Sequence, residues 1–224
     1  MDLVIVNPPR IFPRRPDYQS AKRLVDLILC FAALPFILPV ILLCMLAIYF
    51  DSGRPIFFMQ KRIGRGERPF LIYKFRTLYA NHDESEGRSS MKAYVRGEIG
   101  LEKAGNGNFK PNFEQQIFRV GRILRRTSLD ELPQLINVLK GEMSIVGPRP
   151  NVPWEVEEYR PWHFERLEVL PGITGLAQVN GRSGISFDTI VRYDIKYVVS
   201  QNLMLDLKII WQTIRSVVLS KGAG

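Results

Sequence analysis

Hydrophobic positions divide the chain into one continuous apolar segment and several shorter patterned ones. Residues 27–50 carry no charge, a run of 24 residues. This exceeds the ~20 residues that a helix needs to cross the hydrocarbon core of a membrane, so the run predicts a membrane helix. Further along, residues 56–60 and 69–75 flank Gly64 and Gly66. They predict two strands joined by a glycine-bearing turn.

Two features of the apolar segment argue against a straight membrane span. Pro35 and Pro39 lie in its middle, where each removes a backbone hydrogen bond and favours a bend. Basic residues also flank both ends, with Lys22 and Arg23 before it and Arg54 after it. Basic flanks stay in the cytoplasm. We therefore prefer a re-entrant helix hairpin, broken at the two prolines, to a single span.

The segment 127–141 has the pattern of an amphipathic helix starting near Asp130, with Gly141 just past its end. Two adjacent carboxylates, Asp130 and Glu131, stand at the start. One interpretation is structural: Ser128 and Glu131 fit a capping box, and acids in a first turn complement the helix dipole. The other is that the two acids carry chemistry. This segment alone leaves both open.

A basic arm with several prolines occupies residues 1–21, and these prolines predict no helix before residue 20. Residues 79–116 are predicted to be mostly loop, over 82–90 and 105–108, with one short helix between. Such a stretch is either a lid over a site or an insertion, and we favour an insertion.

Beyond residue 141, Arg149 stands between Pro148 and Pro150, so a stiff turn presents its guanidinium. Helices are predicted at 154–170, 186–197 and 203–219, a turn at 171–175, and a short strand or loop at 176–182. The last helix mixes apolar and cationic positions. It fits either a helix lying on lipid or one packed on the core. The predicted fold class is α+β and mostly helical, with one small β-hairpin.

Composition favours anionic partners. The 224 residues contain 31 Lys and Arg against 22 Asp and Glu, a formal net charge of +9. Nucleic acid, an anionic membrane and phosphorylated substrates all fit that charge. Cys30 and Cys44 both lie in the apolar segment and are expected to be apolar filler, not a disulfide. The chain opens with no pattern typical of a cleavable signal peptide.

Eight ordered runs of the sequence resemble the monotopic phosphoglycosyl transferases, bacterial sugar transferases that start polysaccharide assembly on polyprenyl phosphate. They are KRLVD (22–26), QKRIG (60–64), YKFRT (73–77), RRTSLDELPQ (125–134), NVLKGEM (137–143), VGPRP (146–150), PGITG (171–175) and AQVNGR (177–182). Each run alone is weak, but the ordered set is specific and covers roughly residues 20–219.

The resemblance implies a reaction. A nucleotide diphosphate sugar, expected to be a UDP-sugar, passes its phosphosugar to polyprenyl (undecaprenyl) phosphate and releases the nucleoside monophosphate. In the family the aspartate of the Asp-Glu pair is the nucleophile and the glutamate binds Mg²⁺. By that match Asp130 forms an aspartyl phosphosugar intermediate, and Glu131 holds the metal. Covalent catalysis of this kind divides one displacement into two.

In this reaction a carboxylate anion attacks a phosphate anion, so nearby cations are needed to neutralise the charge. We expect Arg149 and Arg125 first, and then Lys74 and Arg182, to bind substrate phosphates. Asp194 matches an acidic family position and is either catalytic support or part of a structural ion pair.

The resemblance also implies a location and partners. We expect the cytoplasmic face of a bacterial plasma membrane, with the re-entrant helix over 22–52 and the catalytic domain over 53–224. Anionic lipid is an expected partner, nucleic acid is not, and a homo-oligomer is left open. Small family members break the membrane helix at a Ser-Pro pair, where this chain has Leu38 and Pro39. The proline bend is kept and the hydroxyl is lost.

Two other function classes remain. One is a binding protein tethered by a single span, but no nucleic-acid motif appears and the basic residues are dispersed. The other is a polymerising or glycosyl-donor enzyme in which the two acids serve as general acid and base. Release of nucleoside diphosphate instead of monophosphate distinguishes this enzyme from a phosphosugar transferase.

Overall fold

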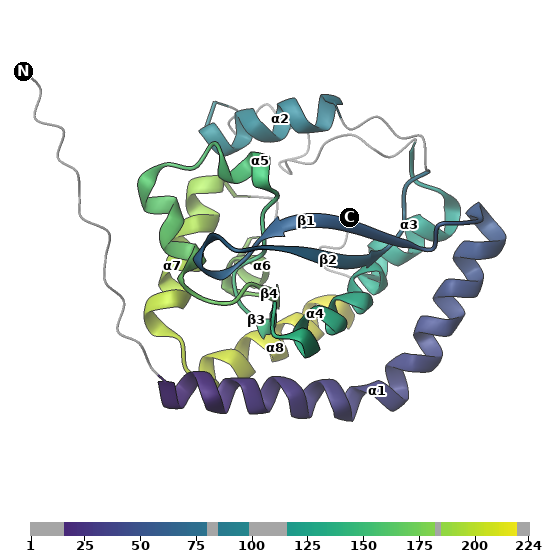
Figure 1. The fold of residues 1–224 in the computed structure, drawn as a ribbon, viewed down its shortest axis with the longest axis horizontal. Helices are drawn as coiled ribbons and strands as arrows, with labels where there is room; N and C mark the ends of the chain where they lie inside the picture. The colour runs from purple at the N-terminus through teal and green to yellow at the C-terminus, as the bar shows by residue number, and fades with distance from the viewer. Residues whose placement is uncertain (1–15, 80–84, 99–115, 182–184, 219–224) are drawn as a thin grey trace, which may run out of the picture.

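The computed structural model describes residues 16–79, 85–98, 116–181 and 185–218, in which helices surround a central β-hairpin (Figure 1). The elements that precede the acidic pair are α1 (Pro16–Ser52), β1 (Phe57–Ile63), the 3-10 helix η1 (Arg65–Glu67), β2 (Pro69–Phe75), α2 (Ser85–Arg96) and α3 (Arg119–Thr127). Those that follow are the 3-10 helix η4 (Leu129–Gln134), α4 (Leu135–Lys140), β3 (Ser144–Val146), α5 (Pro153–Val156), the 3-10 helix η5 (Pro161–Glu168), β4 (Gly172–Thr174), α6 (Leu176–Asn180), α7 (Phe187–Ser200) and α8 (Leu203–Val218). The predicted class, mostly helical α+β, is confirmed.

Helix α1 is one continuous helix of 37 residues that bends, with Pro35 and Pro39 inside it. In Figure 1 it runs along the bottom of the view and then turns upward on the right. Within the described residues it is the one helix long and apolar enough to cross a membrane. The prediction of a long apolar helix is confirmed. Its form differs from a hairpin, because the helix bends at one place and does not fold back on itself.

The first half of α1 is attached to the rest of the chain by polar contacts. Lys22 Nζ and the Tyr18 hydroxyl donate to Asp206 Oδ2 of α8, at 2.9 and 2.8 Å. The Arg23 guanidinium donates to the carbonyl oxygens of Val138 and Leu139, at 2.5 and 2.9 Å, at the end of α4. These contacts place the start of α1 against α4 and α8.

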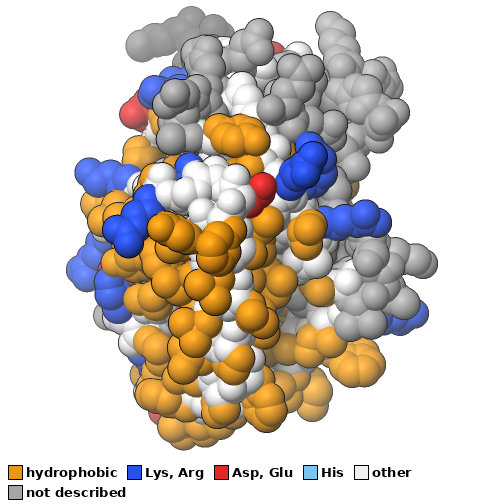
Figure 2. Space-filling model, turned by 90° about the vertical axis from the view of Figure 1, so that its right-hand side faces the viewer, with side chains coloured by type: hydrophobic (Ala, Val, Ile, Leu, Met, Phe, Trp, Pro, Cys, Tyr) orange, Lys and Arg blue, Asp and Glu red, His pale blue; other side chains and the backbone are white. Residues whose placement is uncertain are grey.

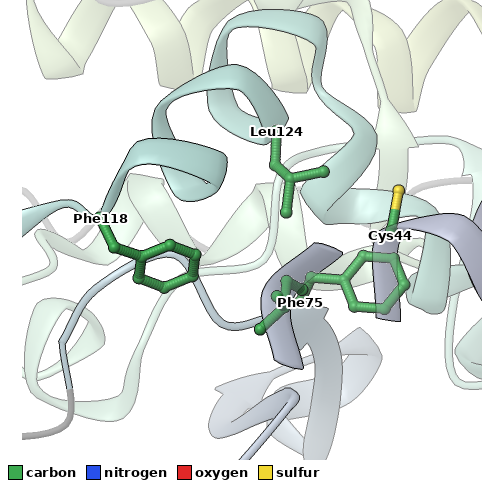
Figure 3. Close-up of a cluster of buried hydrophobic side chains, with 5 residues drawn as sticks. Cys44, Phe75, Phe118 and Leu124 are labelled. Carbon is green, nitrogen blue, oxygen red and sulfur yellow. The ribbon is translucent and has the colours of Figure 1, made fainter. Parts of the chain in front are cut away.

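The second half of α1 is attached to the opposite end of the same domain. Cys44 and Ile48 are buried with Phe75, Phe118 and Leu124, and the side chains converge from α1, β2 and α3 (Figure 3). A straight helix of 37 residues would be about 55 Å long at 1.5 Å per residue. Both ends of α1 contact one domain, and the bend accommodates this.

The predicted hairpin is confirmed. Strands β1 and β2 pair antiparallel from Phe57 opposite Phe75 to Ile63 opposite Pro69. The connection contains Gly66 at φ 61°, a left-handed conformation that glycine adopts without steric cost. The hairpin lies at the centre of the molecule in Figure 1, below α2 and α5.

The segment with the acidic pair differs from the single helix that was predicted. A 3-10 helix, η4, contains Asp130 and Glu131, and the α-helix begins only at Leu135. Pro133 lies in the 3-10 turn, where its missing N–H removes an α-helical bond. The capping box does not form, because Ser128 is left-handed at φ 58° and its side chain makes no capping bond. Gly141 ends α4 at φ 78°, as predicted.

A small parallel sheet lies where the sequence suggested a turn. Strand β3 pairs with β4, so the prediction of a turn over 171–175 is wrong. Glycine allows these two segments of the chain to lie close together, since a Cβ on Gly172 would overlap the backbone of Gly147. Local sequence carries no information on a partner 28 residues away, which is why the pairing was missed.

Other local predictions have mixed outcomes. Helices α7 and α8 confirm the last two predicted helices. Pro16 begins α1, so residues 16–19 are helical where an arm was predicted, because proline is tolerated at the first helical position. Helix α2 starts at Ser85, inside a predicted loop. Residues 154–170 form two short helices, α5 and η5, separated before Pro161, and α6 replaces a predicted strand or loop.

One face of the molecule is strongly apolar. Figure 2 shows hydrophobic side chains gathered over its lower half, on the side where α1 turns upward. Phe36 and Phe50 of α1 have exposed fractions of 79% and 82%. On α8, Met204 and Trp211 are exposed by 75% and 67%. A patch of this extent marks a surface that is covered by something other than water.

Candidate active site

The two acids lie on η4, which packs against β2 of the hairpin. Although they are adjacent in sequence, their environments differ. Glu131 Oε1 accepts a hydrogen bond from Lys74 Nζ at 2.7 Å and another from Arg149 Nη1 at 3.1 Å. Among the residues that the structure describes, no hydrogen bond or ion pair holds the Asp130 carboxylate. Glu131 is therefore held by two cations, whereas Asp130 has no bonding partner in the part of the chain that the structure describes.

The two surroundings move the two pKa values in opposite directions. Burial acts to raise the pKa of Glu131, but the charges and hydrogen bonds of Lys74 and Arg149 outweigh it and hold the pKa at about 2. Burial raises the pKa of Asp130 above its ordinary value; Lys74 opposes this and the Glu131 charge adds to it. A pair of acids separated in this way usually has two different roles.

Lys74 reaches the acids from β2, and Asn137 holds that strand in place. The Asn137 side chain is fully buried. Its Nδ2 donates to Leu71 O at 2.6 Å, and its Oδ1 accepts from the Tyr73 backbone N–H at 3.1 Å. Asn137 thus joins α4 to the residue before Lys74 and fixes the distance from the ammonium to Glu131.

The backbone around Arg149, which was predicted to be a stiff turn because of the flanking prolines, is hydrogen-bonded from two sides. Arg166 Nη2 donates to Arg149 O at 3.0 Å, and Arg62 Nη1 donates to Pro150 O at 3.0 Å. The Arg149 side chain itself is 51% exposed. It can therefore reach Glu131 and still turn towards an incoming anion.

Three further residues were predicted to belong to the site: Arg125, Arg182 and Asp194. Arg125 Nε donates to Thr77 Oγ1 at 2.9 Å, and its positive charge favours the ionised form of Asp130. Arg182 lies outside the described residues. Asp194 is not in contact with the acidic pair. It is 1% exposed and forms an ion pair with Arg166 at 2.6 Å, because two charges at that depth require each other. Asp194 therefore belongs to a structural ion pair behind Arg149, which is one of the two roles predicted for it, and among the described residues it does not lie with the predicted substrate-binding cations.

A cleft of about 510 Å³ opens beside the acidic pair, with walls from the hairpin, η4, α2 and α5. Its volume is within the range of small-molecule sites. The six cations of the lining are Arg62, Lys74, Arg76, Arg88, Arg125 and Arg149, and its two acids are Asp130 and Glu155. The aromatic lining residues are Phe57, Phe58, Phe75, Tyr79 and Trp154. A cationic cleft with aromatic walls and one free carboxylate suits a phosphorylated ligand with a ring system.

The family model described as bacterial sugar transferase matches residues 17–220. The chain belongs to the bacterial sugar transferase family. This confirms the resemblance noted in the sequence and the expected enzyme class. The transferase is 37% identical over 209 residues to an exopolysaccharide production protein, ExoY, of Rhizobium meliloti, with 93% of this chain and 90% of the relative covered.

Two longer relatives have names that state a reaction. The undecaprenyl-phosphate galactose phosphotransferase of Salmonella typhimurium is 37% identical over 202 residues, which cover 90% of the transferase and 41% of that protein. The UDP-N-acetylgalactosamine-undecaprenyl-phosphate N-acetylgalactosaminephosphotransferase of Aeromonas hydrophila is 34% identical over 214 residues, covering 93% and 46%. The transferase therefore corresponds to less than half of each of these two proteins.

The residues of the transferase fit a magnesium ion that is shared with substrate. Within the described residues, no group of three or more His, Cys, Asp or Glu side chains could enclose a metal. Magnesium is usually bound by one or two carboxylates plus substrate phosphates, and not by a complete protein cage. Glu131 is ionised and engages both cations through Oε1. Its Oε2 is the protein oxygen that such an ion would use.

Several cleft residues were not predicted as site residues. Arg62 and Arg76 lie in runs that carry the family resemblance, and the alternation of side chains along the predicted hairpin places Arg62 on the same face as Lys74. Arg88 and Trp154 had no such signal. They come from α2 and α5 and meet only in the folded transferase. The described part of the predicted insertion is thus a wall of the cleft.

Proposed function

We propose that the protein transfers a sugar-1-phosphate from a UDP-sugar to undecaprenyl phosphate, releases UMP, and so starts a polysaccharide. The names of the relatives from Salmonella typhimurium and Aeromonas hydrophila support the two substrates. The observation that carries the proposal is the Asp130 carboxylate, which lines a cationic cleft and has no bonding partner within the described residues, next to Glu131, which is held by two cations. That arrangement leaves one acid for covalent chemistry.

In the first step an Asp130 oxygen attacks the phosphorus that bears the sugar. The bond from that phosphorus to the bridging oxygen breaks, and UMP leaves with the bond's electron pair. An acyl phosphate now joins the sugar to Asp130. A buried carboxylate with a raised pKa is more basic than one in water, which favours this attack.

In the second step a phosphate oxygen of undecaprenyl phosphate attacks the same phosphorus. The bond to Asp130 breaks and the carboxylate is restored, so atoms and charges balance over the cycle. Lys74, Arg149 and Arg125 stabilise the charge that accumulates on the phosphate oxygens. A magnesium ion on Glu131 would supply further charge neutralisation for the diphosphate. In the absence of substrate, Lys74 and Arg149 keep Glu131 ionised.

The protein would carry out this reaction at the cytoplasmic face of the membrane. Both ends of α1 contact the same domain, and the middle of the helix is apolar and exposed. This supports a helix that enters the membrane and returns to the side from which it came. Exposed apolar residues of α8, with Lys208 and Arg215 on the same helix, support contact with lipid headgroups.

The test is the identity of the released nucleotide. Purified protein is mixed with undecaprenyl phosphate, Mg²⁺ and a panel of UDP-sugars, and UMP and UDP are separated by chromatography. UMP formed only with lipid acceptor over many turnovers supports the proposal. UDP release would instead assign a glycosyl transfer with the acids as general acid and base. Absence of both nucleotides with every donor would contradict a transferase that uses UDP-sugars.

A second measurement tests the covalent step directly. The protein is incubated with the active UDP-sugar but without lipid, digested under mild conditions and analysed by mass spectrometry. A phosphosugar adduct on the peptide that contains Asp130 is expected. The Asp130→Asn variant serves as the matched control and should carry none.

A further inference from the structure

One wall of the cleft has no part in the chemistry described above. Trp154 of α5 and Arg88 of α2 both line the cleft, and the Arg88 guanidinium lies over the Trp154 ring, 5.4 Å from its centroid. The guanidinium is a cation that lies above the face of the indole. This face of the ring is therefore turned to the cleft and has a partner from another helix above it.

The wall is held rigidly. Glu158 accepts hydrogen bonds from Lys92 Nζ at 2.8 Å and from Arg96 Nε at 2.7 Å, which tie α2 to the segment after α5. The Tyr94 hydroxyl donates to Ile185 O at 2.5 Å, and the Tyr94 ring packs against Phe187 of α7. These contacts hold α2 and the segment that follows α5 in a fixed arrangement. The two helices that form this wall are therefore in place before a ligand arrives, which lowers the entropic cost of binding.

Stacking energies favour a base over the guanidinium. An exposed cation–π contact contributes about 0.5–1 kcal/mol, whereas stacking of a nucleic-acid base on an aromatic side chain contributes about 1–3 kcal/mol. Arg88 is exposed, so its side chain can swing away at little cost. A pyrimidine ring can take its place on the indole.

Charge determines which end of a nucleotide sugar lies here. The phosphates need Lys74, Arg149 and the Asp130 nucleophile. Glu155, next to Trp154, is a carboxylate that also lines the cleft, and it accepts bonds from Asn151 Nδ2 at 2.6 Å and from the Val152 N–H at 3.1 Å. A fixed acid repels phosphate but tolerates ribose hydroxyls, which are donors. The α5 wall therefore suits the uncharged nucleoside.

We infer that Trp154 is the platform on which the pyrimidine base of the nucleotide substrate stacks, on the ring face over which the Arg88 guanidinium lies in the structure. This assignment rests on the proposed function, because it concerns the donor nucleotide of the same site. It makes Trp154 a binding residue, although the sequence indicated only a helix at this position.

Fluorescence tests the assignment without turnover. UMP is titrated into the full-length protein, and quenching of tryptophan emission is recorded. Trp162 is a matched control, because it too has an arginine, Arg192, over its ring but does not line the cleft. The quench should persist in Trp162→Phe and disappear in Trp154→Phe. An equal quench in wild type and Trp154→Phe would overturn the inference. Quenching by UDP-sugar but not by UMP would place the sugar on this ring and would overturn it too.

Kinetics give the second readout. Trp154→Ala should raise KM for the UDP-sugar about 5- to 150-fold, the equivalent of the stacking energy, with kcat changed less than about threefold. Trp154→Phe keeps an aromatic face and should stay within about fivefold of wild-type KM, which separates lost stacking from misfolding. A wild-type KM in Trp154→Ala would overturn the inference while UMP release by the wild type leaves the proposed function standing. If the wild type releases no UMP, the proposed function itself fails.

Discussion

Lys74 Nζ lies 2.7 Å from Glu131 Oε1, and the two residues come from segments 57 positions apart in the chain. This contact gives the two neighbouring acids different environments. Glu131 is held by Lys74 and by Arg149, whereas Asp130, one residue earlier, lines the cleft and forms no hydrogen bond or ion pair with the residues that the structure describes. A residue that only caps a helix would point to backbone N–H groups. Among the described residues, neither acid accepts a hydrogen bond from a backbone N–H group.

Asp130→Asn should abolish transfer, with a loss of at least about 10³-fold in kcat, because an amide oxygen does not form an acyl phosphate with the donor. Glu131→Gln should also be severely impaired. Raised Mg²⁺ is expected to recover part of its activity and none of the activity of Asp130→Asn. UMP release is measured for both variants over a range of Mg²⁺ concentrations. If the Asp130→Asn protein had wild-type activity, the two acids would have only a structural role.

The same two variants should change stability in opposite directions. The pKa of Glu131 is depressed to about 2, so its contribution is complete above the ordinary pKa and is lost as the pH falls towards 2. At pH 7, Glu131→Gln should lower the free energy of unfolding by about 1–3 kcal/mol. The pKa of Asp130 is raised, so its charged form is disfavoured in the folded protein at pH 7. Asp130→Asn should therefore raise the melting temperature.

This gain should shrink as the pH falls below the raised pKa of Asp130, where the wild-type carboxyl is also neutral. Thermal unfolding in one detergent at pH 7 and pH 4 provides the comparison. Equal melting temperatures for the two variants at pH 7 would contradict the opposite pKa shifts of Asp130 and Glu131.

Arg149→Ala should reduce kcat/KM more than Arg125→Lys, by about tenfold or more. The first change removes a charge that contacts Glu131 at 3.1 Å, while the second keeps a charge near Asp130 and loses only the bond to Thr77. Arg122→Ala is a control, since Arg122 is exposed and does not line the cleft. Activities of both site variants close to wild type would place the phosphates elsewhere.

The topology of α1 is tested with single cysteines at Ser20 and Ser52 in a background where Cys30 and Cys44 are alanine. Both positions should react with a membrane-impermeant maleimide from the cytoplasmic side of sealed vesicles, since both ends of α1 contact one domain. Replacing Pro35 and Pro39 together by alanine removes the causes of the bend. A fraction of that variant should then label from opposite sides. If the two cysteines were labelled from opposite sides of the membrane in the protein with both prolines, α1 would be a straight span.

Asp194→Ala should destabilise the fold by about 3–5 kcal/mol, because it leaves the charge of the buried Arg166 guanidinium without its carboxylate partner. Since Arg166 also donates to Arg149 O, kcat should fall at temperatures where the variant is still folded. Glu157→Gln, at a side chain that is 65% exposed, is the control and should change neither quantity. Wild-type melting and activity for Asp194→Ala would show that the ion pair is dispensable.

Much of this protein can be predicted along the chain. An uncharged run that includes two prolines is sufficient to predict a long apolar helix, and strand patterns around Gly64 and Gly66 predict the hairpin. The acidic pair, Arg149 between its prolines and the cation Lys74 could all be selected from their runs. These properties depend on residues a few positions apart, where periodicity and steric effects of proline and glycine operate.

The tertiary structure decided which of those groups act together. Only folding brings Lys74 to Glu131, moves Asp194 behind Arg149 and converts the first turn of the predicted helix into η4. It also paired β3 with β4 and placed Trp154 against Arg88. Each of these depends on contacts between distant segments. Their energies come from burial and charge in the packed state, and no local pattern records them.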